Sequence, residues 1–201
     1  NKNYNELKKY SEVNLDLVKD ILEEAAKINQ NLLLPLAIAG DENPAKLENG
    51  IVRTPPGYKE AYNKYIEDGW ISLSCDPKYG GQGMPKTVSA FFDEMLSSAS
   101  LSFKLYSELS IGAYNCISHH ATDSIKNKFL PKMVQGKWSG TMCLTEPACG
   151  TDLGLLKTKA VEQSDGTYKL SGQKIFITSG DHDLTENIIH VVIARAADSP
   201  P

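Results

Sequence analysis

The sequence MCLTEPACGTD, from Met142 to Asp152, marks the point where the character of the chain changes. Up to Thr145 the residues alternate between two different faces, as a β-strand requires. Pro147 then keeps Glu146 extended, and the turn residues after Cys149 leave backbone N–H groups and a hydroxyl available. Such a turn can bind phosphate oxygens, but a plain polar connection between strands uses the same residue types. The residues alone leave both interpretations open.

Before this stretch, apolar residues recur every three or four positions, which is typical of amphipathic helices. Asn14 is suited to cap the first helix, Pro35 to end it, and Gly69 to close the second. The spacing predicts helices over residues 14–34, 58–66, 88–99, 105–117 and 123–134. We therefore expect a helical domain over residues 1–136.

After Gly136 the period shortens to two, and Ser164-Asp165-Gly166 supplies a hairpin turn signal. The pattern predicts strands over residues 138–145, 155–162, 167–170, 175–178 and 187–195. The last of these is nearly continuously apolar, as in a strand covered on both faces. Helices followed by strands predict the α+β class: an N-terminal helical bundle, then the first part of an antiparallel β domain over residues 137–201.

The composition of the 201 residues is that of an ordinary globular protein, with 41% apolar and 23% charged residues. A net charge of −4 without a basic run argues against nucleic acid or an anionic membrane as a partner. The longest apolar runs, 32–39 and 188–194, are too short to span a bilayer, which takes about 20 residues. Four cysteines without a Cys-x-x-Cys pair suggest buried, reduced thiols, and we expect a cytoplasmic protein.

Other candidate sites are weaker. There is no Gly-x-Gly-x-x-Gly fingerprint and no Gly-Lys-Ser/Thr phosphate loop. Gly80 to Gly83 has the chemistry of a turn, and we interpret it as a plain loop. His119 and His120 could join His182 or His190, but their spacing is not that of metal ligands, so we predict no metal site.

Two segments resemble a known family. Residues 142–152 resemble the Thr-Glu-Pro-x-x-Gly-Ser-Asp signature of acyl-CoA dehydrogenases, and residues 171–178 resemble their second signature, Asn-Gly-x-Lys-x-Trp-Ile-Thr. Their order and separation also fit. Similarity at residues 47–50, 53–57, 76–85, 94–99 and 183–187 points to the long bacterial branch that includes methylthiopropanoyl-CoA dehydrogenases.

This resemblance implies that FAD is held between the helical domain, the β domain and a further helical domain. The implied FAD contacts are Met142, Leu144 and Thr145 along the isoalloxazine edge, Gly150 and Thr151 at the pyrophosphate, Phe176 over the ring and Thr178 near N5. Hydroxyl donors would stabilise charge on a reduced flavin, and an aromatic cover would exclude water. Met142, Thr151 and Phe176 replace the aromatic residue, Ser and Trp that are commoner in the family.

The resemblance also implies the reaction. A carboxylate removes the α proton of an acyl-CoA while the β carbon passes hydride to the flavin, giving a trans-2-enoyl-CoA. The implied substrate contacts are Thr151, Tyr106 and Leu109. In relatives the carboxylate lies in a later domain, so we expect the catalytic base beyond Pro201 and assign Glu146, fixed by Pro147, a structural place.

Both ends of the chain look like cuts, and we expect an N-terminal fragment that is inactive alone and retains FAD poorly. At full length, the resemblance implies a homo-oligomer that passes electrons to an electron-transfer flavoprotein. An acyl-CoA oxidase-type flavoprotein would share these signatures. A non-catalytic interaction module is the alternative from a different functional class.

Overall fold

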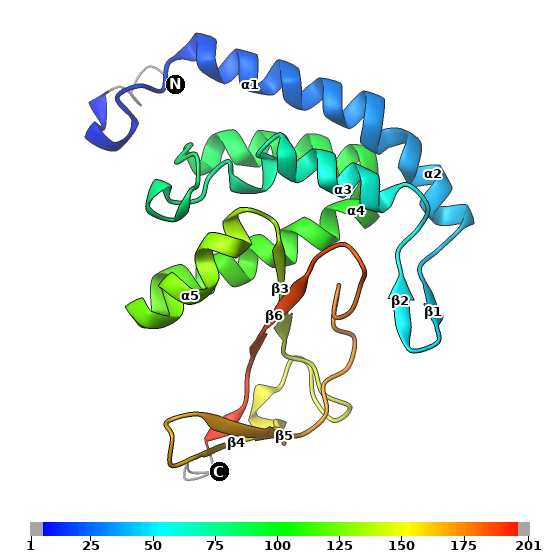
Figure 1. Ribbon diagram of the computed structural model, residues 1–201, viewed down its shortest axis with the longest axis vertical. Coiled ribbons are helices and arrows are strands. Elements are labelled where there is room, and N and C mark those ends of the chain that lie inside the picture. The colour runs from blue at the N-terminus through cyan, green and yellow to red at the C-terminus, as the bar shows by residue number, and fades with distance from the viewer. Residues whose placement is uncertain (1–5, 197–201) are drawn as a thin grey trace.

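The computed structural model describes residues 6–196, with the helices gathered at one end of the molecule (Figure 1). The helices are α1 (Leu15–Ile28), α2 (Leu34–Glu42), α3 (Tyr58–Glu67), α4 (Lys86–His120) and α5 (Asp123–Val134). The strands are β1 (Lys46–Glu48), β2 (Ile51–Arg53), β3 (Trp138–Cys143), β4 (Lys159–Glu162), β5 (Tyr168–Ser171), β6 (Asn187–Val192) and β7 (Arg195–Ala196). The predicted α+β class is confirmed. No helix within residues 6–196 combines the length and apolarity needed to cross a membrane.

The start of α1 was predicted correctly, but its end was not. The Asn14 side chain accepts a hydrogen bond from the N–H of Leu17 at 2.9 Å, which caps the helix. The helical segment does not end at Pro35, because a π-helical turn, Asn29–Leu33, leads directly from α1 into α2. Pro35 lies in the first turn of α2, where its missing N–H needs no partner.

Helix α4 joins the two stretches predicted over residues 88–99 and 105–117. The helix is kinked at Ser100, whose backbone is extended at φ −158° and ψ 91°. Beyond the kink α4 lies against β3, where Ser110 Oγ accepts the N–H of Gly140 at 3.0 Å. The approach is close, because a Cβ at Gly140 would lie 2.5 Å from Cβ of Ala113.

The core of the helical layer is rich in aromatic side chains. Tyr65 meets Phe103 edge to face with ring centroids 5.8 Å apart, and Trp70 stacks on Phe92 at 4.7 Å. Such aromatic pairs stabilise the fold by more than the burial of their apolar surface alone. Leu184, from the loop before β6, belongs to the same buried cluster and is only 7% exposed. The helical core is therefore completed by a residue from the second part of the chain.

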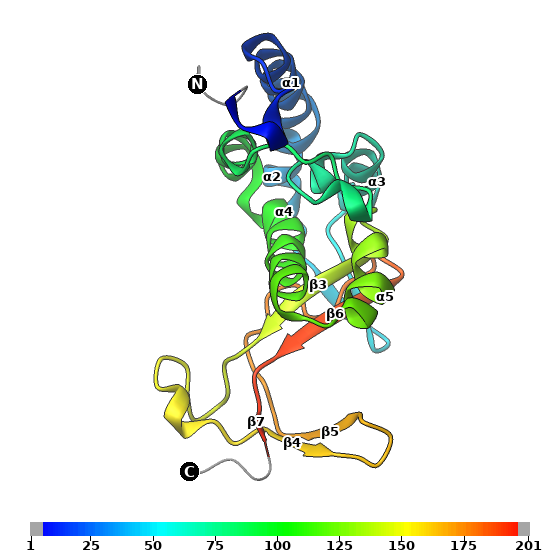
Figure 2. The ribbon, with the colours of Figure 1, turned by 90° about the vertical axis from the view of Figure 1, so that its left-hand side faces the viewer.

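The strands pair in a more mixed way than the antiparallel domain we expected. β3 pairs parallel with β6, and β4 pairs antiparallel with β5 but parallel with β7. Figure 2 shows β4 and β5 at the end of the molecule away from the helices. β4 begins at Lys159 rather than near residue 155, because Leu153–Leu155 forms a 3-10 turn capped by the Asp152 side chain.

Two strand predictions need correction. Residues 175–178 form no strand; Phe176 has a left-handed backbone with φ 57°. The run 187–195 divides into β6 and β7, and Ile188, Ile189 and Val191 are only half-buried, so β6 is not covered on both faces within the described residues.

The hairpin of β1 and β2 was not predicted. Its turn is Asn49-Gly50, with φ of 52° and 80°, the left-handed pair that a type I′ turn requires. The hairpin projects beside the loop before β6 (Figure 1). Its base is tied to that loop by Asp183, which accepts the N–H and hydroxyl of Thr54 at 3.1 and 2.8 Å.

Candidate functional site

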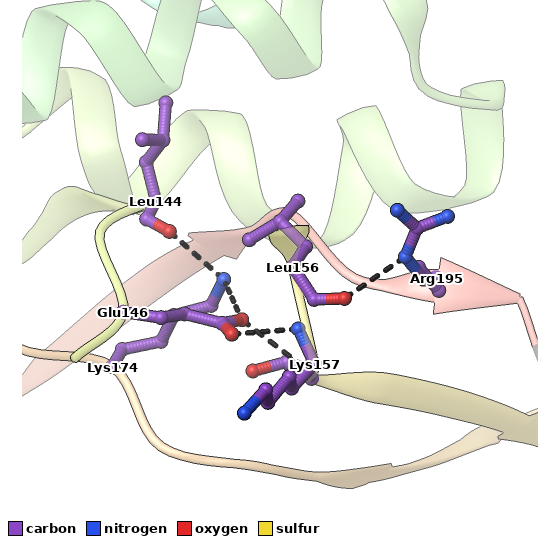
Figure 3. Close-up of polar contacts among 7 residues, drawn as sticks. Leu144, Glu146, Leu156, Lys157, Lys174 and Arg195 are labelled. Atoms are coloured by element: carbon purple, nitrogen blue, oxygen red, sulfur yellow. Dashed lines mark hydrogen bonds and ion pairs between the residues drawn. The ribbon is translucent and has the colours of Figure 1, made fainter. Parts of the chain in front are cut away.

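The structure brings the two signatures into direct contact. The N–H of Ile175 donates to the carbonyl oxygen of Thr145 at 2.9 Å. The ammonium of Lys174 donates to the carbonyl oxygen of Leu144, also at 2.9 Å (Figure 3). Residues 142–146 and 174–176 therefore form one surface, although about 30 positions separate them in the sequence.

This surface combines exposed apolar side chains with hydroxyl groups. Phe176 is 88% exposed and Met142 is 38% exposed. Leu144 and Thr145 are half-buried, and Thr178 is exposed. The left-handed backbone of Phe176 costs about 1–2 kcal/mol for a residue with a Cβ. Backbone strain of this kind clusters at functional sites.

A tight turn follows Thr145. Glu146 and Cys149 exchange backbone hydrogen bonds of 2.8 and 3.1 Å. Gly150 and Thr151 come next and are exposed; a Cβ at Gly150 would meet only the Thr145 methyl group, at 3.9 Å. The backbone at Gly150 therefore has open space beside it, and binding of an anion by this turn stays a prediction.

Arg195 supports the chain just after this turn. Its Nε donates to the carbonyl oxygen of Leu156 at 2.9 Å (Figure 3). Its Nη2 donates to the carbonyl oxygen of Gly154. The guanidinium thus fixes both ends of the short segment that leads from the turn into β4.

Glu146 lies at the centre of the polar contacts. Its buried carboxylate accepts the N–H of Lys157 at 2.7 Å, the N–H of Thr158 at 3.1 Å and the ammonium of Lys174 at 2.8 Å (Figure 3). The hydrogen bond from Lys174 is the largest cause that lowers the pKa of Glu146 to about 2, and hydrogen bonds from Thr158 and from the N–H of Lys157 add to it. Glu146 is held as an anion, which agrees with the structural place we expected.

The far end of the second signature is anchored on the helical layer. Ser179 Oγ donates to the carbonyl oxygen of Leu105 on α4 at 3.3 Å. His182 is buried; its Nδ1 accepts the N–H of Leu184 at 3.2 Å, and its Nε2 lies 3.1 Å from Ser139 Oγ. Burial lowers the pKa of His182, and the neighbouring Asp181 and Asp183 oppose this shift.

Tyr106 and Leu109 lie on α4 and are half-buried. The Tyr106 ring packs edge to face on His182, with centroids 5.4 Å apart, and on Tyr58 at 6.2 Å. Tyr106 therefore contacts the loop that follows the second signature. Contact of either side chain with an acyl group stays a prediction.

No group of three His, Cys, Asp or Glu side chains in residues 6–196 is arranged to hold a metal ion. All four cysteines are free thiols. Cys75, Cys143 and Cys149 are buried, whereas Cys116 is only half-buried. Gly80 to Gly83 forms a turn in which a Cβ at Gly81 would clash with the Cys75 carbonyl, while Gly80 and Gly83 have left-handed backbones with φ of 94° and 67°.

Comparison with known proteins decides the family. The sequence model of the acyl-CoA dehydrogenase N-terminal domain matches residues 19–137, and that of the middle domain matches residues 141–200. The chain belongs to the acyl-CoA dehydrogenase family. The resemblance of the two signatures is thereby confirmed.

Among acyl-CoA dehydrogenases, the chain is 47% identical to 3-methylmercaptopropionyl-CoA dehydrogenase of Ruegeria pomeroyi, over 96% of this chain and 33% of that protein. Butyryl-CoA dehydrogenase of Megasphaera elsdenii superposes with a TM-score of 0.75 at 29% identity, over 93% of this chain and 46% of that one. An acyl-CoA dehydrogenase of Bacillus anthracis, solved in complex with FAD, has a TM-score of 0.73 at 25% identity, over 92% of this chain and 29% of that one. The chain spans about a third of the length of the curated relatives it matches.

Three polar residues of this acyl-CoA dehydrogenase chain were not predicted as parts of the site: Lys174, His182 and Arg195. Lys174 lies inside the second signature, so its charge opposite Glu146 was a signal that could have been used. Arg195 bonds to the carbonyl oxygen of Leu156, and His182 lies beside the hydroxyl of Ser139; both partners are about 40 positions away, where no local pattern could indicate them.

Proposed function

We propose that this chain forms one wall of the FAD and acyl-CoA site of an enzyme that oxidises acyl-CoA thioesters to trans-2-enoyl-CoA. The observation that carries the proposal is the hydrogen bond from Ile175 to Thr145, which joins the two signatures into one exposed surface. FAD would supply the two-electron acceptor. Family membership and the FAD-bound relative support this cofactor.

The exposed groups fit a flavin in their chemistry. Phe176 and Met142 offer apolar area to a flat ring, with Leu144 beside them. The hydroxyls of Thr145 and Thr178 can donate to the polar rim, where added electron density is stabilised by such donors. Gly150 and Thr151 follow a tight turn and suit a pyrophosphate. We propose these seven residues as the FAD contacts of this chain.

We further propose that Thr151, Tyr106 and Leu109 contact the acyl-CoA. Thr151 is exposed and follows the tight turn of residues 146–149, and in this proposal it lies near both the cofactor and the substrate. We also propose that the full-length protein, of which this chain is a part, is a homo-oligomer that passes electrons to an electron-transfer flavoprotein. The proposed division between helical and β domains lies at residue 136.

The catalytic carboxylate, in this proposal, comes from outside these 201 residues. Two carboxylates lie within the first signature: the oxygens of Glu146 are occupied by Lys174 and two N–H groups, and Asp152 accepts the N–H of Gly154. The 201-residue chain should therefore show no turnover of acyl-CoA with an artificial electron acceptor, while the protein at full encoded length turns over. Turnover by the short chain would contradict the proposal.

The experiment for the main proposal is anaerobic addition of butyryl-CoA or 3-methylmercaptopropionyl-CoA to the purified protein at full encoded length. Bleaching of the visible flavin absorption and formation of the enoyl-CoA are the expected results. In a parallel experiment in aerated buffer, rapid oxygen consumption on addition of substrate would instead indicate an oxidase. A protein that folds but takes up no FAD would refute the proposal and favour a non-catalytic module.

A further inference from the structure

Three separate segments meet at the carboxylate of Glu146. Glu146 follows β3, Lys157 and Thr158 lead into β4, and Lys174 belongs to the second signature. The pair is well shielded, with the side chains of Glu146 and Lys174 only 3% and 11% exposed. Lys174 also reaches the carbonyl oxygen of Leu144, so it bonds on both sides of Thr145.

The loop that carries Phe176 and Thr178 has no strand partner to hold it. On one side it is fixed by Lys174 and by the N–H of Ile175; on the other, Ser179 bonds to α4. Phe176 and Ser179 both adopt left-handed backbones, with φ of 57° and 54°. A residue with a Cβ keeps such a conformation only when its surroundings impose it.

We propose that Glu146 and Lys174 are positioning residues, which together set where Phe176 and Thr178 lie relative to Thr145. This inference rests on the proposed function, because those three residues are proposed flavin contacts. Neither Glu146 nor Lys174 needs to touch the cofactor. Their effect on a bound flavin passes through the backbone of the second signature.

The charged pair suits this role better than an apolar pair would. A buried ion pair seldom stabilises a fold more than packed apolar side chains of similar size. It does impose direction: the carboxylate oxygens must face two N–H groups and one ammonium, and the ammonium must also face a carbonyl oxygen. An apolar replacement for Lys174 could fill the space without fixing the loop.

The test compares Lys174→Met, Glu146→Gln and the double variant in the protein at full encoded length. Lys169→Met on β5 is the matched control, since it removes an exposed lysine outside both signatures. The first measurement is amide hydrogen exchange of residues 172–180 in flavin-free protein. We expect about tenfold faster exchange in Lys174→Met and no change in the control.

The second measurement uses FAD-loaded protein with matched flavin content. We expect the flavin reduction rate to fall about tenfold in Lys174→Met and the reduction potential to shift, with KM nearly unchanged. The double variant should be no worse than the more damaged single variant, because both changes break one unit. Lys174→Arg, which keeps a charged donor, should recover part of the rate.

Parent-like exchange, rate and potential in both Lys174→Met and Glu146→Gln would overturn the inference. If Lys174→Met does not fold, the same measurements are made on Glu146→Gln and Lys174→Arg. Parent-like exchange, rate and potential in Glu146→Gln would then overturn the inference. A parent protein that binds no FAD would defeat the proposed function, yet the exchange measurement would still confirm or refute the positioning of the loop.

Discussion

The hydroxyl of Thr178 lies two residues beyond Phe176, on the exposed part of the second signature. If it donates to a flavin that becomes electron-rich on reduction, its bond is worth about 1.5–3 kcal/mol. Thr178→Val keeps the branched shape and should slow flavin reduction by roughly one to two powers of ten and lower the reduction potential.

Stopped-flow reduction by a good acyl-CoA substrate measures this effect. Thr167→Val, in the turn between β4 and β5, is the control because it removes a hydroxyl outside the proposed contacts. If Thr178→Val reduces at the parental rate and potential, its hydroxyl does not contact the flavin.

Glu146 should also determine part of the dependence of the protein's stability on pH. Its pKa is lowered from 4.5 to about 2, with the bond from Lys174 as the largest cause. As the pH falls below about 4.5, the unfolded chain takes up this proton while the folded chain resists, so stability is lost down to about pH 2. Glu146→Gln should therefore be less stable near neutral pH but lose less stability on acidification.

Urea unfolding of the 201-residue chain at steps from about pH 7 to about pH 3 checks this slope. Glu162→Gln changes an exposed carboxylate on β4 and should keep the parental slope. Parallel slopes for Glu146→Gln and the parent would show that the carboxylate is not held as an anion in the fold.

At the scale of elements, the contact between α4 and β3 depends on Gly140. A Cβ there would lie 2.5 Å from Cβ of Ala113 and 3.0 Å from Cε of Met133. Gly140→Ala should force strand and helix apart and destabilise the chain by about 1–3 kcal/mol.

Gly112→Ala is the matched control on the same helix, because no atom lies within 4 Å of a Cβ placed there. It should stabilise by up to about 1 kcal/mol through helix propensity. Denaturant unfolding of both variants gives the comparison. Equal stabilities would mean that β3 can shift away from α4 without loss.

Sequence patterns correctly predicted the elements that are determined by residues close to one another in the chain. The Asn14 cap, the closing Gly69 and the period of α3 all act within one turn of helix. The residues 175–178 were wrongly predicted as a strand because β-branched and aromatic side chains favour strands, while contacts with Thr145 and α4 impose another backbone. The Glu146–Lys174 pair joins positions 28 apart in the sequence, and the periodicity of a helix or strand cannot predict a contact over that distance.

At the scale of the whole molecule, the small sheet β5-β4-β7 exposes apolar side chains. Tyr168 and Leu170 on β5 are 55% and 50% exposed, and Val161 on β4 is 43% exposed. β5 is also an edge strand of this sheet. Open edges with apolar side chains promote association, so the 201-residue chain should form oligomers as its concentration rises.

Sedimentation velocity over a concentration series measures this tendency. Leu170→Lys should reduce association, because a charge on an edge strand opposes pairing. Ile125→Lys, at an exposed apolar position of α5, is the control and should leave it unchanged. A parent chain that stays monomeric at high concentration would contradict the prediction.

Leu184 has a consequence for the order of folding during synthesis. The aromatic helical core contains this side chain, which follows α5 by some 50 positions, so the core lacks one buried side chain when α5 leaves the ribosome. We therefore expect the helices to be incompletely packed until the loop before β6 has been made. A nascent chain arrested after α5 should therefore be cut readily by proteases, and resistance should appear only once residues beyond Leu184 have emerged.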